Sequence, residues 1–164
     1  MLASAICITF ASVIITMLVE VLQNRALEKL QECGIKPSVQ RIAIMDYLLK
    51  SYSHPTAEDV YAALHEEMPT LSRTTVYNTL RLFAEQGAAR MLTIDERKVC
   101  FDGQMHPHAH FQCRRCGRLY DMPLPDLPHL SEQEFRADGH TIEEIHYYYK
   151  GLCRMCRTSE EKND

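Results

Sequence analysis

The 164-residue sequence lacks an excess of basic residues: 18 Lys and Arg stand against 22 Asp and Glu, and the formal net charge is −4. A protein that binds nucleic acid over its whole surface is therefore excluded, and any contact with phosphate must be local. With 46% hydrophobic and 24% charged residues, the chain is neither a disordered tail nor a fibre. Its length suits one large domain or two small ones.

Charge is absent from the first nineteen positions, and no Lys or Arg precedes Arg25. A secretory signal peptide begins with a basic region, so this segment does not predict export. The stretch approaches the ~20 apolar residues of a membrane-spanning helix, but Ser and Thr residues dilute it, so we do not expect a membrane partner either. We interpret residues 1–21 as an apolar N-terminal extension with Met17 as an alternative start, and expect residues 1–16 to be dispensable.

Four of the seven cysteines form two Cys-x-x-Cys pairs, Cys113 with Cys116 and Cys153 with Cys156. The two-residue spacing lets both sulfurs of a pair bind one ion, and four thiolates complete a tetrahedron without an open position. We therefore predict structural zinc, bound in a reducing cytoplasm and coupled to folding. The alternative, a thioredoxin-like dithiol, needs a βαβ pattern that the sequence does not show. The isolated cysteines, Cys7, Cys33 and Cys100, are given no role.

A second group of metal-binding residue types is the run His106-Pro-His108-Ala-His110. In a strand, side chains two residues apart share a face, so these imidazoles could converge, with Asp102 upstream and Asp121 on a neighbouring strand. Nitrogen and oxygen donors without thiolate suit iron, manganese or zinc. Their weaker binding suits a sensor, while surface histidines without function are the alternative.

The first half of the chain has the periodicity of amphipathic helices. Apolar residues recur at three- and four-residue steps over 22–33 and 39–51, and Gly34 ends the first helix. Thr56 and Ser72 are predicted N-caps of two further helices, the first of which ends before Pro69 and the second at Gly87. Two short strand-like runs follow at 88–94 and 98–102.

Two helices joined by a short turn and followed by a hairpin are typical of a winged helix-turn-helix. Residues 73–98 contain five basic and three acidic residues, whereas residues 57–67 contain four acidic residues and no Lys or Arg. The second helix is therefore expected to enter the major groove, while the first faces away from phosphate. The residues that would contact DNA are Arg73, Thr74, Thr75, Tyr77, Asn78 and Arg81. A plain three-helix bundle with a solvated polar face is the alternative.

The C-terminal part changes character. We predict two strands around a Cys-x-x-Cys turn over 108–122, a short helix over 126–137 and a long strand over 140–153. An α+β unit of this size has few apolar residues, so we expect it to be stabilised by dimerisation or by metal.

Together these motifs resemble the ferric uptake regulator (Fur) family of metal-dependent bacterial repressors over residues 22–157. The motifs are Gln40-Arg41 at a helix start, HPTAEDVY from His54, TTVYNTL from Thr74, HPHAHFQCRRCG from His106 and GLCRMC at the end. The resemblance implies an α+β protein that binds double-stranded operator DNA as a homodimer. It implies a winged-helix DNA-binding domain at 22–101 and a small α/β metal-binding dimerisation domain at 102–157. Beyond the region of resemblance, we expect residues 158–164 to be a polar tail. Gln40 and Arg41 join the candidate DNA contacts.

By position, the resemblance also implies a regulatory site for iron or manganese, formed by His54, Asp102, His108, His110 and Asp121. By itself, His54 is only a turn histidine. As a ligand from the DNA-binding domain, it would let the ion clamp the two domains together. An aspartate at 121, where iron-responsive members carry glutamate, resembles the peroxide-sensing (PerR) branch. In that branch peroxide would oxidise His54 or His108.

An iron- or zinc-responsive homeostasis repressor is the alternative within the family. Pro107 and Ala109 occupy positions that bear ligands of an additional site in iron-responsive members. An extra site here would need His106 or His146.

Two alternatives lie outside the family. A non-haem metalloenzyme would use His108, His110 and Asp102 as a facial triad. No recognisable substrate pocket or general base supports it, so we expect neither an enzyme nor a small-molecule substrate. A zinc-stapled interaction module would use the four cysteines but not Asp121.

Overall fold

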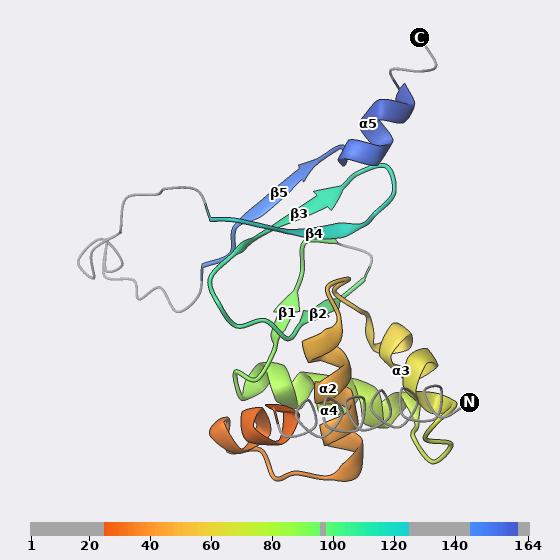
Figure 1. The fold of residues 1–164 in the computed structure, drawn as a ribbon, viewed down its shortest axis with the longest axis vertical. Helices are drawn as coiled ribbons and strands as arrows, with labels where there is room; N and C mark the ends of the chain where they lie inside the picture. Colours follow the sequence, from red (N-terminus) through yellow and green to blue (C-terminus); the bar gives the residue numbers. More distant parts are fainter. Residues whose placement is uncertain (1–24, 96–97, 125–144, 161–164) are drawn as a thin grey trace, which may run out of the picture. The chain divides into compact units, whose positions relative to one another are not determined.

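A computed structural model of the protein describes residues 25–95, 98–124 and 145–160 (Figure 1). These residues form two compact units. The first unit contains residues 25–93 and 98–105, and the second contains residues 94–95, 106–124 and 145–160. The sequence placed the boundary between 101 and 102, whereas residues 102–105 group with the first unit. In the described ranges, no helix is both long enough and apolar enough to cross a membrane.

The first unit begins with four helical segments. Residues 25–32 are helical, followed by α2 (Val39–Lys50), α3 (Ala57–His65) and α4 (Arg73–Glu85). The side chain of Thr56 accepts a hydrogen bond from the Asp59 N–H, while the Asp59 carboxylate accepts one from the Thr56 N–H. Ser72 caps α4 by accepting from the Thr75 N–H. The predicted N-caps are confirmed, because capping depends on residues close in sequence.

Apolar side chains from all four helical segments form the core of this unit. The largest fully buried members include Leu30, Ile44, Leu48, Val60, Leu80 and Phe83. They recur at the three- and four-residue steps seen in the sequence, so each helix buries one stripe against the others.

A short hairpin follows α4. Strand β1 (Arg90–Leu92) pairs antiparallel with β2 (Cys100–Asp102), so the unit has the helices and wing of a winged helix-turn-helix. The Phe101 N–H donates to the Pro55 carbonyl oxygen at 2.9 Å, which attaches β2 to the segment before α3. A Cβ atom at Gly103 would lie 3.1 Å from the Leu48 backbone, so a larger residue there would press against α2.

The second unit is a three-stranded sheet with a C-terminal helix (Figure 1). The strands are β3 (Ala109–Cys113), β4 (Leu119–Met122) and β5 (Tyr148–Gly151), in the order β4-β3-β5. β3 runs antiparallel to β4 and parallel to β5. Helix α5 (Arg154–Glu160) follows.

Some predictions for the C-terminal part need correction. Of the long strand expected over 140–153, residues 140–144 lie outside the described residues, and residues 145–153 form a strand only at 148–151. Beyond its C-terminal end, the Cys153 N–H donates to the Cys113 Sγ atom instead of continuing the sheet ladder. Helix α5 includes residues 158–160, where the sequence predicted a polar tail. The expected helix over 126–137, the N-terminal extension and the end of the tail (161–164) lie outside the described residues.

Candidate metal centres and DNA-binding surface

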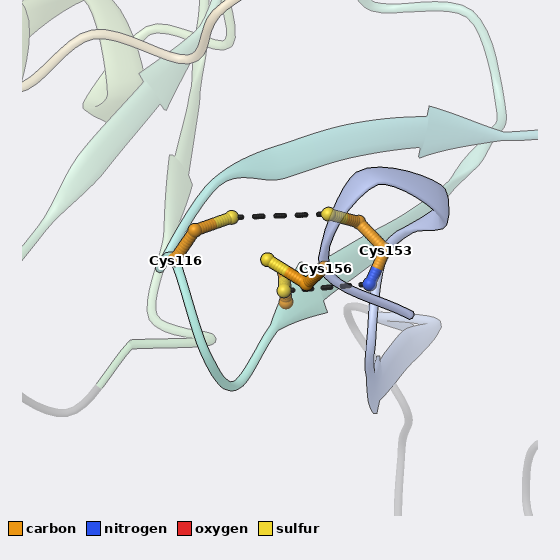
Figure 2. Close-up of side chains that lie close together, drawn as sticks. Cys116, Cys153 and Cys156 are labelled. Carbon is orange, nitrogen blue, oxygen red and sulfur yellow. Dashed lines mark hydrogen bonds between the residues drawn. The ribbon is translucent and has the colours of Figure 1, made fainter. Parts of the chain in front are cut away.

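Four cysteine sulfurs of the second unit lie within 4.8 Å of one another. Cys113 ends β3, Cys116 lies in the turn towards β4, and Cys153 and Cys156 come from the start of the α5 region. The Cys116 and Cys153 Sγ atoms are 3.9 Å apart (Figure 2). A tetrahedral zinc ion with Zn–S bonds of about 2.3 Å needs sulfurs about 3.8 Å apart. The four cysteines therefore fit structural zinc.

Hydrogen bonds and burial shift the pKa values of three of these thiols, Cys113, Cys153 and Cys156, in different directions. Backbone N–H groups of Cys116 and Cys153 donate to the Cys113 sulfur and lower its pKa to about 6. The Tyr120 hydroxyl hydrogen-bonds to Cys153 and lowers the pKa of that thiol, while the same bond raises the pKa of Tyr120. Burial raises the pKa of Cys156 to about 12. Zinc binding at neutral pH therefore requires proton release from this centre.

A second centre within the same unit consists of His108, His110 and Asp121. The His108 and His110 Nε2 atoms are 3.0 Å apart, and Asp121 Oδ1 lies 3.4 Å from the first and 3.8 Å from the second. The β3–β4 register pairs His110 with Asp121 directly. An octahedral ion with bonds of about 2.1 Å separates neighbouring donors by about 3.0 Å. Two imidazoles and one carboxylate form the donor set of non-haem iron(II) sites, so the cluster fits iron or manganese.

A backbone carbonyl orients one of these ligands. His108 Nδ1 lies 2.8 Å from the His106 carbonyl oxygen, which can only accept a hydrogen bond. We therefore assign the proton to Nδ1, which leaves the Nε2 lone pair directed at His110. For both Nε2 atoms to bind one ion, no proton can remain between them. Metal binding at this centre consequently competes with protons.

The two other expected ligands lie in the first unit. His54 and Asp102 are buried, at 4% and 3% exposed. His54 adopts a left-handed backbone conformation with φ of 51°, which is uncommon for a residue other than glycine and typical of functional positions. The Asp102 Oδ1 atom accepts from the Gln104 N–H at 2.7 Å. The five expected ligands are thus divided, two in the first unit and three in the second.

His106 and His146, which an extra metal site would need, are placed differently. The His106 ring lies 4.7 Å from the His108 ring, and His146 Nδ1 lies 3.3 Å from the Tyr148 hydroxyl. Among the described residues, neither histidine belongs to a group of three or more side chains that could hold an ion.

Four of the predicted DNA contacts line one groove of the first unit. On α4, five of the predicted contacts are exposed and Thr75 is half-buried. The groove, of about 450 Å³, is lined by Gln40, Arg41, Thr75 and Asn78, and its remaining lining residues are neutral or basic. One of these is Lys36, exposed and just before α2, which the sequence analysis missed. Its position beside a predicted helix start was the available signal.

The chain matches the ferric uptake regulator family over residues 32–150, and it belongs to this family. The peroxide operon regulator of Bacillus subtilis is 36% identical over 137 residues, which cover 84% of this chain and 94% of the relative. The peroxide-responsive repressor PerR of Staphylococcus epidermidis is 33% identical over 140 residues, covering 85% and 92%.

Solved structures confirm the α+β fold with its winged-helix unit. The iron-bound ferric uptake regulator of Francisella tularensis superimposes with a TM-score of 0.62 at 25% identity, covering 76% of this chain and 96% of that one. A zinc uptake regulator complexed with zinc and DNA superimposes with a TM-score of 0.66 at 19% identity, covering 87% and 97%, and supports the fold alone.

Proposed function

We propose that this protein is a metal-dependent, DNA-binding transcriptional repressor that responds to peroxide. The observation that carries the proposal is the cluster of His108, His110 and Asp121, a two-histidine, one-carboxylate donor set in a chain that also carries a winged helix-turn-helix. The similarity to the peroxide regulators of B. subtilis and S. epidermidis supports the peroxide signal.

In this proposal, His54 and Asp102 complete the regulatory site from the first unit. An iron or manganese ion bound by ligands from both units would favour the arrangement that fits DNA. The metal can act as a switch only to the extent that it binds this arrangement more tightly than others. By reciprocity, operator DNA then tightens metal binding by the same factor.

Ferrous iron, when bound, would activate hydrogen peroxide, so that one peroxide oxygen is inserted at an imidazole C–H carbon and the other leaves as water. The residues of the chain hold the ion, direct the His108 Nε2 lone pair towards it, and provide imidazole rings that can be oxidised. His54 and His108 are the proposed targets. An oxidised ring is a poorer ligand, so oxidation would weaken metal binding. The arrangement that fits DNA would then be lost, and the protein would release the DNA.

The remaining roles follow from family membership and from the cysteine centre. Cys113, Cys116, Cys153 and Cys156 bind structural zinc, and the second unit forms the homodimer. We place the protein in the cytoplasm, where thiols remain reduced and operator DNA is accessible. A regulator needs no turnover, so we propose that it is not an enzyme.

DNA binding is proposed for the surface that combines the start of α2 with α4. The contacts are Gln40, Arg41, Thr74, Thr75, Tyr77, Asn78 and Arg81, with Lys36 added from the groove. Basic residues there would neutralise phosphates, and polar side chains on α4 would reach base edges.

The test compares iron with manganese in the zinc-containing protein. After hydrogen peroxide treatment, the iron-loaded protein should lose DNA affinity and gain the mass of one oxygen on a peptide that contains His54 or His108. The manganese-loaded protein should show neither change. Tightening of DNA binding by zinc or iron without any response to peroxide would favour the homeostasis alternative. Equal DNA affinity with and without regulatory metal would contradict the proposed switch.

A further inference from the structure

Arg73, the first residue of α4, is held by side chains of α3. Its Nε atom lies 3.0 Å from Glu58 Oε2, and its Nη2 atom lies 3.0 Å from Glu58 Oε1. The guanidinium carbon also lies 4.2 Å from the centre of the Tyr61 ring. Glu58 and Tyr61 are three residues apart and share a face of α3. A planar guanidinium can bind a carboxylate with two groups while it lies over a ring, and a lysine ammonium cannot.

The charge at this position also needs compensation. A cation at a helix N-terminus opposes the helix dipole, and the first turn of α4 contains no acidic residue. Glu58 supplies the missing negative charge from α3, and its hydrogen bonds raise the pKa of Arg73. The Arg73 and Glu58 side chains are 66% and 63% exposed, so the pair adds little to global stability. Its effect is on orientation.

Arg81 provides the contrast. Its Nη2 atom lies 2.9 Å from Glu85 Oε1 on the same helix, four residues away. Such a pair connects no second element, and Arg81 remains a candidate DNA contact. Arg73, by comparison, joins the two helices of the helix-turn-helix.

We propose that Arg73 is a positioning residue and not a DNA contact. With Glu58 and Tyr61 it forms a clamp, here the Arg73 clamp, that sets the first turn of α4 against α3. Thr75 and Asn78, which line the groove next to α2, follow within the next two turns and take their positions from it. The inference rests on the proposed function only in its statement about DNA.

The test uses the full-length, manganese-loaded protein. The DNA probe is a duplex that the wild-type protein has selected from a random DNA library. Glu58→Gln and Arg73→Lys should each weaken binding to this duplex about tenfold, because each substitution removes the bidentate ion pair between Glu58 and Arg73. Binding to a scrambled duplex should stay unchanged, and so should the slope of log K against log salt. The exchanged pair Glu58→Arg with Arg73→Glu should restore specific binding. Glu67→Gln, an exposed neutralisation beyond the end of α3, is the matched control.

Two outcomes would overturn the clamp. If Arg73 neutralised a phosphate, Arg73→Met would reduce the salt slope by about 0.9. Glu58→Gln would then tighten binding to both duplexes.

A readout without DNA separates the clamp from the proposed function. Hydrogen exchange at the Val76 amide, which donates to the Ser72 carbonyl, should be faster in Glu58→Gln and Arg73→Lys than in the wild type and in Glu67→Gln. Equal exchange in all four proteins contradicts the clamp. If the wild type enriches no DNA sequence, the proposed function fails, while hydrogen exchange still decides whether the clamp exists.

Discussion

The cysteine centre and the histidine–aspartate centre share strand β3 but differ in chemistry. The cysteine centre uses four soft thiolates drawn together at the end of β3 and the start of α5. The other centre uses one imidazole on β3, a second from the residue just before this strand, and a carboxylate from β4. Four thiolates leave zinc no open position, whereas three nitrogen and oxygen donors leave room for further ligands. The comparison teaches that one small sheet can present both a donor set that is closed around zinc and one that suits an exchangeable metal.

The largest expected effect comes from removing a thiolate. Cys153→Ser should abolish zinc binding and unfold the second unit, because structural zinc contributes about 10–16 kcal/mol to domains of this kind. Zinc content by mass spectrometry and thermal unfolding measure the effect. Cys33→Ser, at a cysteine outside the centre, is the control. Normal zinc content in Cys153→Ser would contradict a structural zinc ion that needs all four thiolates.

Removing the carboxylate should affect only the exchangeable metal. Asp121→Ala should weaken manganese binding by on the order of 100-fold, since one charged ligand of the site is lost. Titration of the zinc-containing protein with manganese measures the affinity. Zinc content and unfolding temperature should equal those of the wild type. A parallel loss of zinc would mean that the two centres are not independent.

The pKa values of Cys113 and Cys156 should make zinc binding depend on pH in two steps. Near pH 7, Cys113 with a pKa of about 6 is already a thiolate, while Cys156 with a pKa of about 12 must release its proton to bind zinc. Zinc affinity should therefore rise with pH. Below about pH 6, zinc affinity should fall more steeply with decreasing pH, because Cys113 is then also protonated and must lose its proton to bind zinc. Each additional proton that zinc must displace makes the affinity change by a further factor of about ten per pH unit. Competition with a chelator across pH 5 to 8 checks this change in slope. A constant slope would contradict the assigned order of acidities.

The smallest expected effect concerns the hydrogen bond to Cys153. Tyr120→Phe should raise the pKa of that thiol and weaken zinc binding by roughly tenfold, as for other residues that support metal ligands. Competition with a chelator measures the change. Tyr149→Phe, an exposed tyrosine on β5, should behave as the wild type. Equal zinc affinity in both variants would contradict the proposed support of Cys153 by the Tyr120 hydroxyl.

The elements that the sequence predicted well depend on nearby residues. Thr56 and Ser72 cap their helices through backbone N–H groups three positions away, so their role is visible in a short window. The strand expected to reach residue 153 ends at Gly151, and just beyond it the Cys153 N–H donates to the Cys113 sulfur, 40 residues away in sequence. Periodicity contains no information about such a contact.

The same distinction applies to the candidate sites. The sequence identified both cysteine pairs and the alternating histidines, because their spacing is local. It named Asp121 as a carboxylate on a neighbouring strand, and the β3–β4 register places this residue directly beside His110. It also counted Arg73 among the DNA contacts, although Glu58, 15 residues earlier, binds the guanidinium. Whether Arg73 nonetheless reaches DNA is decided by the experiment on the clamp.

The sequence by itself determined the family, the ligand types and the helices, because motif spacing and apolar periodicity are properties of short segments. The tertiary structure decided how close Asp121 lies to the two imidazoles, how the pKa values of Cys113 and Cys156 differ, and which arginine is engaged by α3. These features depend on strand register, burial and contacts between distant residues, and such contacts form only when the chain folds.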